Sequence, residues 1–246
     1  MPGLGTLINV GAILVGASLG VLIGHRLPER TRVTVTDALG LVTLVIGGLN
    51  LLALADEAYI EAVTSAGTLL IVLASLLIGG IAGSLLRIEQ RLEQFGGWLQ
   101  RRFTKAGEPR ARVIEGFVMA SLVVCIGPLA ILGSLSDGLG QGIEQLALKS
   151  VLDGFASLAF AASLGWGVAA SALSVGVFQG LVTVLGFFAG SVLPAALIAS
   201  ISATGGVLLL GVGMRLLNIR SVPVGDMLPA LLVAPILTAI VGTLLA

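Results

Sequence analysis

The sequence predicts an all-α, polytopic transmembrane helix bundle of about eight helices, within a range of six to eight. Two observations carry this prediction. The 246 residues have a mean hydropathy of +1.11 and only 11% charged side chains, whereas about a quarter of the residues in soluble domains are charged. The apolar residues also fall into runs of about twenty, the length that crosses the hydrocarbon core as a helix. Because the intervening loops are short, residues 1–246 are expected to form a single integral membrane domain.

Eight apolar windows approach the spanning length, and their order gives the expected elements. The first window follows no basic segment and precedes no cleavage site, so we expect it to remain as a span. Windows five and six are separated only by turn signals at Gly165, Trp166 and Gly167, so they either cross separately or form one re-entrant hairpin, which leaves six crossings. The windows are Leu4–Ile23, Asp37–Leu54, Ala62–Leu86, Ile114–Leu135, Leu146–Leu164, Ala170–Leu193, Ala195–Leu217 and Met227–Leu245.

The basic residues set the expected orientation in the membrane. Three gaps between windows, at residues 26–32, 87–112 and 215–220, hold three, seven and two Lys or Arg residues, and only Lys149 lies elsewhere. These gaps follow windows one, three and seven, so a chain that crosses at every window places all of them on one side. Because basic loops remain in the cytoplasm, we expect the N-terminus outside.

The longest gap, residues 87–112, is predicted to be a cytoplasmic basic amphipathic segment at the inner leaflet. A plain topogenic loop attracted to anionic lipid explains the same charges without any regulatory role. Membrane lipid is the expected partner in both cases. The apolar positions near helical spacing are Ile88, Leu92, Phe95 and Leu99.

Windows one to three resemble windows six to eight, which predicts two inverted three-helix repeats flanking two central helices. At an offset of 165, seven of fifteen positions between Ala38 and Leu52 are identical, and at an offset of 170 Asn9 aligns with Gln179. Window one and window six run in opposite directions under the expected topology. A chain with 35 glycines also produces such matches by chance, so coincidence remains the alternative.

Polar residues within the apolar windows are the candidate substrate-binding residues, because each must be satisfied inside the bundle or in a cavity. Asn9 and Gln179, paired by the repeat, are expected to face a central site from opposite sides. Interhelical hydrogen bonding without a ligand is the alternative. The segment Ile201–Gly206 places two hydroxyls before a double glycine, where a helix break would expose backbone groups to an ion. Its candidate residues are Ser202, Thr204, Gly205 and Gly206.

Two aspartates are candidates for an outer gate. Asp137 lies in the loop after window four, and Asp153 lies near the start of window five. Lys149 precedes Asp153 by four residues, so the two are first expected to form an ion pair on one helix face near the outer interface. In the alternative, Asp137 and Asp153 line an acidic outer vestibule.

The sequence argues against an enzyme and against a cofactor or metal site. His25 is the only histidine and lies in a basic gap, and Cys125 is the only cysteine, so neither a nucleophile with its base nor a metal-ligand set is present. No phosphate-binding loop of the Walker type occurs either. With a formal net charge of zero, no nucleic-acid partner is expected.

Several segments resemble a family of uncharacterised bacterial integral membrane proteins, the domain of unknown function 554, or YqgA-like, family. They are the glycine-rich start from Gly5, the segment from Glu115 through Leu139, LKSVLDGF from Leu148, FQG from Phe178, SATGG from Ser202 and LPALLVAP from Leu228. The resemblance implies a multi-pass protein of the bacterial inner membrane. It implies no activity and no site residues.

Two functions are consistent with these features. Helix breakers interrupt two windows, at Gly127 and Pro128 in window four and at Pro229 and Pro235 in window eight. Together with the repeat and the intramembrane polar residues, they predict a secondary transporter or channel-like protein for a small ion or metabolite. The alternative is a scaffold or assembly partner that binds other helices, or a second copy of itself, through glycine-rich faces. A wet central cavity would favour the first function, and dry helix contacts would favour the second.

Overall fold

The computed structural model describes residues 2–24, 28–91, 94, 110–125, 128–140, 142–189 and 194–245. Within these ranges the chain is largely helical and contains no strand, which confirms the all-α prediction. Seven segments in the described part are long and apolar enough to cross a membrane. They are Leu4–Gly24, Glu29–Ala55, Ser65–Leu85, Glu144–Leu164, Trp166–Phe188, Ala195–Leu216 and Val224–Leu245.

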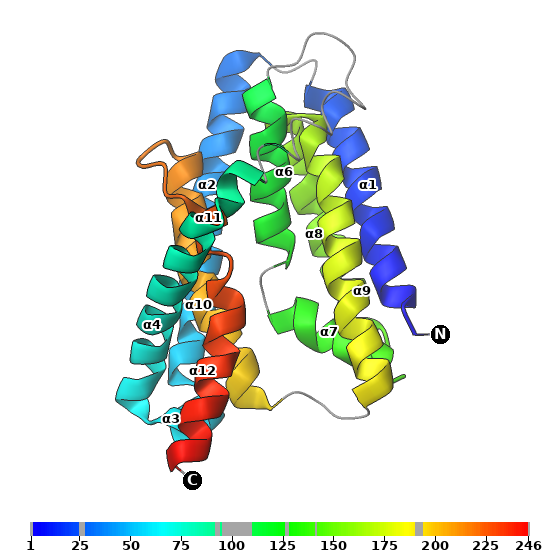
Figure 1. Ribbon diagram of the computed structural model, residues 1–246. Helices are drawn as coiled ribbons and strands as arrows, with labels where there is room; N and C mark the ends of the chain where they lie inside the picture. Colours follow the sequence, from blue (N-terminus) through cyan, green and yellow to red (C-terminus); the bar gives the residue numbers. More distant parts are fainter. Residues whose placement is uncertain are drawn as a thin grey trace. The chain divides into compact units, whose positions relative to one another are not determined.

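The helices divide into two compact units, each with its own internal packing (Figure 1). Unit 1 comprises α1 (Leu4–Gly24), α6 (Arg110–Cys125), α7 (Pro128–Gly138), α8 (Glu144–Leu164), the short 3-10 helix η2 (Trp166–Ala170) and α9 (Ser171–Ala189). Unit 2 comprises η1 (Leu52–Ala55), α3 (Glu57–Val63), α4 (Ser65–Leu85), α10 (Ala195–Leu216), α11 (Val224–Met227) and α12 (Ala230–Leu245). The helix α2 (Glu29–Leu51) contributes residues to both units.

Windows five and six have the lengths of two separate crossings, which favours these over a re-entrant hairpin. Each window forms a segment of spanning length, α8 and η2–α9, and Gly165 joins them with a positive φ of 84° that favours glycine. The sharpest bend within a window lies in window four, where α6 and α7 meet at an angle of 81°. Pro128 opens α7 at this bend, as expected of a residue that lacks a backbone donor. Gly127, the other predicted breaker, lies outside the described residues.

Three glycines of α1 let this helix lie directly against α8. A Cβ atom on Gly16, Gly20 or Gly24 would overlap the carbonyl oxygen of Gly154, Leu158 or Ala162, respectively. The contacts advance by four residues on both helices in the same direction, so α1 and α8 are parallel. Small residues at this spacing allow the close backbone approach on which helix association in membranes depends.

The helix break predicted within Ile201–Gly206 is wrong, because α10 continues without interruption from Ala195 to Leu216. Gly206 has a packing role instead. A Cβ on Gly206 would lie 2.8 Å from the carbonyl oxygen of Gly47 in α2, so a larger residue would separate the two helices. Gly213 has the same relation to the Gly40 carbonyl, at 3.0 Å. These pairs show that α2 and α10 pack antiparallel.

Contacts at the end of α4 also stabilise the packing of unit 2. Gly83 of α4 lies against the backbone of Asp226, which leaves no room for a Cβ. The Asp226 carboxylate accepts a hydrogen bond of 2.9 Å from the Glu89 amide, and the Glu89 side chain forms a 2.7 Å ion pair with Arg215 at the end of α10. Of the predicted amphipathic segment 87–112, only residues 87–91, 94 and 110–112 are described.

Tyr59, the only tyrosine of the chain, fixes α3 within unit 2. Its side chain is fully buried, and its hydroxyl donates to the Thr68 carbonyl oxygen at 3.3 Å. Burial raises the pKa of Tyr59 above its ordinary value, against a smaller lowering by a hydrogen bond with Thr238. The phenol is therefore neutral at physiological pH.

The raised pKa of Tyr59 predicts a loss of stability in alkali. The unfolded chain releases this proton at about pH 10, whereas the folded chain retains it, so unfolding becomes more favourable as the pH rises above that value. We expect the difference in free energy of unfolding between the wild type and Tyr59→Phe to shrink above about pH 10. Chemical unfolding at a series of pH values measures it, and tyrosinate absorbance of the folded protein gives the pKa directly. A tyrosine that ionises at its ordinary pKa in the folded protein would contradict this prediction.

Candidate functional site

Unit 1 contains a buried ion pair on α8. The Lys149 Nζ lies 2.8 Å from Asp153 Oδ1 and 2.7 Å from Asp153 Oδ2, so the ammonium meets both carboxylate oxygens. Both side chains are less than one-tenth exposed. The predicted ion pair between residues i and i+4 is thus confirmed, but it lies inside the unit and not at an exposed surface. A buried charge pair within a spanning helix is costly and marks a candidate functional site.

Asn9 and Gln179 extend this pair into a cluster of four side chains, the polar cluster, which also contains Lys149 and Asp153. The Asn9 Nδ2 donates to Asp153 Oδ2 at 2.9 Å and to Gln179 Oε1 at 3.3 Å. Asn9 and Gln179 are fully buried, on α1 and α9. Asn9 and Gln179 thus meet through an interhelical hydrogen bond, and Asp153 joins them; their role in a central binding site remains a prediction.

Two polar atoms of the polar cluster have no hydrogen-bond partner among the described residues. They are Asn9 Oδ1, an acceptor, and Gln179 Nε2, a donor. The hydroxyl of Ser157, one turn after Asp153 on α8, is buried and unpartnered in the same way. Each such group loses its hydration without compensation. The cluster therefore has unused capacity to bind a small polar species.

Few charged residues surround the polar cluster. The helices α1 and α9 and the short helix η2 contain none, whereas α6, which also packs against α8 and α9, carries Arg112 and Glu115 in its first turns. The buried Asp137 of α7 lies at the start of α1. No group of three His, Cys, Asp or Glu side chains that could hold a metal ion occurs in the described part of the chain. Asp153 and Lys149 balance each other, so the cluster is neutral as a whole.

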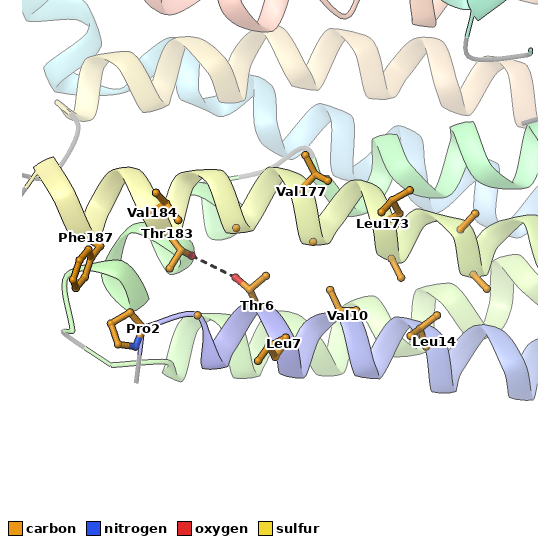
Figure 2. Close-up of a pocket in the computed structure, with 16 residues that line it drawn as sticks. Pro2, Thr6, Leu7, Val10, Leu14, Leu173, Val177, Thr183, Val184 and Phe187 are labelled. Carbon is orange, nitrogen blue, oxygen red and sulfur yellow. Dashed lines mark hydrogen bonds between the residues drawn. The ribbon is translucent and has the colours of Figure 1, made fainter. Parts of the chain in front are cut away.

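A long groove of about 910 Å³ runs between α1 and α9 (Figure 2). Its walls are almost wholly apolar, and its polar side chains are Thr6 and Thr183, whose hydroxyls lie 3.4 Å apart across the two helices. Gly176 and Gly180 of α9 line it as well. A Cβ on Gly180 would meet nothing within 4 Å, so this glycine leaves open space and does not serve close packing.

Asp137, the other predicted gate residue, is buried near the start of α1. Its carboxylate accepts a hydrogen bond of 3.1 Å from the Gly5 amide in the first turn of that helix. A carboxylate at this position satisfies an otherwise free amide and interacts favourably with the helix dipole. This capping contact gives Asp137 a structural role in unit 1, and its role in a gate remains a prediction.

The predicted residues of the SATGG segment lie in unit 2, on α10. Ser202 and Thr204 are buried, and their hydroxyls have no hydrogen-bond partner among the described residues. Gly205 and Gly206 are buried within the continuous helix. A role for these four residues in binding a substrate remains a prediction, without the exposed backbone groups that a helix break would have supplied.

From the sequence, Lys149 was expected only to neutralise Asp153, and Ser157 was not among the candidate residues. The signal for Lys149 was present, because apart from Arg215 at the end of window seven it is the only basic residue within an apolar window. Ser157 follows Asp153 by four residues and so shares its face of the helix. A search for all polar residues on the Asp153 face of window five would have found it.

Comparison with known proteins identifies the family. A family model described as "Protein of unknown function (DUF554)" matches residues 4–239. The chain is 32% identical over 241 residues to "Uncharacterized protein YqgA" of Escherichia coli (strain K12), covering 96% of each chain. It is 28% identical over 239 residues to "Uncharacterized membrane protein YdfK" of Bacillus subtilis (strain 168), again with 96% of each chain covered. No solved structure matches. The chain is a membrane protein and belongs to the DUF554 family.

Proposed function

We propose that this membrane protein is a secondary transporter or channel-like protein for a small ion or metabolite, with the polar cluster as its binding site. The observation that carries the proposal is the buried Lys149–Asp153 pair, which Asn9 and Gln179 join with unused hydrogen-bonding capacity. Ionisable residues inside membranes are expensive and typically mark ion or substrate pathways. The proposal assigns the protein neither catalytic activity nor a cofactor.

Parallel packing of α1 and α8 supports eight crossings. If α2 and α4 each cross once after α1, the chain returns to the side on which α1 ended. The bent pair α6–α7 must then cross for α8 to run parallel to α1, as the contacts of Gly16, Gly20 and Gly24 require. A re-entrant pair would make α8 antiparallel. We therefore propose eight crossings of the bacterial inner membrane, with the N-terminus outside and the basic gaps in the cytoplasm.

Three helix contacts support the proposed inverted repeat. Each helix of the first set packs against its counterpart in the second: α1 with α9, α2 with α10, and α4 with α12. All three pairs are antiparallel. Thr6 contacts Thr183 and Val10 lies beside Gly176, so contacts between α1 and α9 run in opposite directions along the two helices. At α4, Gly79 lies against Ala230 and Gly83 against Asp226, just before α12. A pseudo-two-fold axis in the membrane plane relates counterpart helices in this way.

Ligand-induced thermal stabilisation of the purified, detergent-solubilised protein tests the proposed function. A ligand that binds only the folded state at 100 times its Kd stabilises it by about 2.7 kcal/mol. We expect a member of a panel of small ions and metabolites to raise the melting temperature of the wild type. Gln179→Met, which removes the amide at similar volume, should lose this response.

The matched control is Ser18→Ala on α1, whose hydroxyl is exposed and bonds only to the Leu14 carbonyl within its own helix. This variant should retain the full response. A stabilising ligand that acts equally on Gln179→Met would show that the binding site lies elsewhere. The absence of stabilisation across a broad panel would contradict the proposed function.

The apolar groove between α1 and α9 supports a second candidate function, that of a membrane scaffold. Its open space at Gly180 and its apolar walls suit a helix of a partner or of a second copy of the chain, since small residues permit close approach between helices. A scaffold requires no solute site. A panel without any stabilising ligand would favour it over transport.

A further inference from the structure

We infer that the Asp153 carboxylate is part of an alkali-cation site, which the Lys149 ammonium occupies as a tethered cation. The inference deepens the proposed function, on which it rests for its biological role: the cation would be the transported or coupling ion. The ammonium lies within 2.8 Å of both carboxylate oxygens, so Asp153 already binds one positive charge at close range.

Oxygen atoms suited to an alkali cation converge beside Asp153. Asp153 Oδ2 and Gln179 Oε1 lie 2.9 and 3.3 Å from a single atom, Asn9 Nδ2. Half a turn of the Asn9 amide would replace this nitrogen with Oδ1, which has no partner among the described residues. A carboxylate oxygen and two amide oxygens would then face one position. Hard cations in proteins prefer carboxylate and amide oxygen ligands.

The charge of the cluster selects a monovalent cation. Asp153 is its single carboxylate, and neither α1 nor α9 contributes a charged side chain. One positive charge is therefore balanced, whereas a divalent ion would leave a buried charge uncompensated, at high cost. A proton would neutralise Asp153 equally well, and after the same half turn of the amide the carboxyl O–H would donate to Asn9 Oδ1. Sodium is therefore distinguished from a proton by the separate sodium and pH arms of the test below.

Binding of the cation requires the Lys149 ammonium to withdraw from Asp153, because two positive charges cannot share one buried carboxylate without a net charge. The helix offers a place for it. Gln145 lies four residues before Lys149, on the same face of α8, and is exposed; four residues of helix span about 6 Å along the axis. A lysine side chain covers such a distance with its flexible stem while its charged end remains in polar surroundings. Lys149 and the alkali cation should therefore compete.

Competition predicts that Lys149→Met binds sodium more tightly than the wild type does. Sodium binds only the state in which Lys149 has withdrawn. Minor states are typically about 0.1–10% populated, and the apparent Kd is inversely proportional to that fraction. We therefore expect the apparent Kd for sodium to fall by about tenfold or more. The full chain in detergent is titrated with sodium chloride, with choline chloride added to hold ionic strength constant, and its melting temperature is followed. The matched control is Lys149→Met/Asp153→Asn, which lacks the carboxylate but contains no unpaired buried charge.

The inference holds if sodium saturably stabilises Lys149→Met and not the double variant. It is overturned if choline stabilises Lys149→Met equally, or if only a lower pH does. Should Lys149→Met fail to fold, equilibrium binding of radioactive sodium to the wild type and to Asn9→Leu decides the matter: saturable binding that Asn9→Leu weakens supports the site, and its absence from the wild type overturns it.

Flux measurements separate this inference from the proposed function. Sodium binding at Asp153 without solute or sodium flux in proteoliposomes would leave the cation site intact and contradict transport. Flux that continues unchanged without any alkali cation would support transport and overturn the cation site.

Discussion

Asp153→Leu is expected to lower the free energy of unfolding by about 3–5 kcal/mol, the usual cost of removing one partner from a buried ion pair. The carboxylate holds the Lys149 ammonium with both oxygens and accepts from Asn9 Nδ2. Without it, the ammonium remains in a unit where no other charged side chain bonds to it among the described contacts. Reversible unfolding in mixed detergent micelles measures the change, and size-exclusion chromatography shows whether the variant remains monodisperse.

The double variant Lys149→Met/Asp153→Leu is the decisive comparison for this prediction. It removes both charges and fills the space with apolar side chains, a replacement that is often neutral or stabilising by about 1–4 kcal/mol. We therefore expect it to regain most of the stability lost in Asp153→Leu. If the double variant were as unstable as the single one, the loss would come from the contact with Asn9 or from packing, and not from an unpaired charge.

Gly16→Ala is expected to disrupt the packing of α1 against α8. A single methyl group at this position would overlap the Gly154 carbonyl, and backbone atoms cannot rotate away as a side chain can. Overpacking typically costs about 1–3 kcal/mol, and occasionally more; we expect a loss at or above the upper end of this range. The variant should also lose any ligand response of the polar cluster, because Asn9 lies on the displaced helix.

Gly11→Ala is the matched control for Gly16→Ala on the same helix. A Cβ at Gly11 would meet nothing within 4 Å. The change should therefore be neutral or should stabilise the protein by up to about 1 kcal/mol, since alanine favours the helix over glycine by that amount. Thermal unfolding of the two variants side by side measures the contrast. Equal losses in both would show that α1 and α8 are not in direct backbone contact.

The candidate site was predictable only where it depends on local geometry. Lys149 and Asp153 are four residues apart on one helix, so helical periodicity brings their side chains together whatever surrounds them. Asn9 and Gln179 were expected to face one central site from opposite sides, because the internal similarity aligned them. That Asp153 joins them could not be predicted, because α1, α8 and α9 are apolar around most of their circumference and give no indication of the face that each turns inward.

The roles of individual glycines likewise could not be predicted from the sequence. In the sequence, Gly11 and Gly16 are two glycines of one apolar window, yet only Gly16 contacts the α8 backbone. The double glycine at Gly205 and Gly206 suggested a helix break, whereas α10 is continuous and Gly206 lies against Gly47 of α2. A glycine permits either a break or a close approach, and the neighbouring helix decides which occurs.

The sequence by itself determined that this chain is an all-α membrane protein, where its spanning segments lie, and that Lys149 pairs with Asp153. These properties follow from hydrophobicity and from spacing along one helix, which need no knowledge of neighbours. Only the tertiary structure decided that α10 is unbroken and that Asn9, Gln179 and Asp153 form one buried cluster. The physical reason is that the rotation and register of apolar helices are set by side-chain packing between segments far apart in the chain.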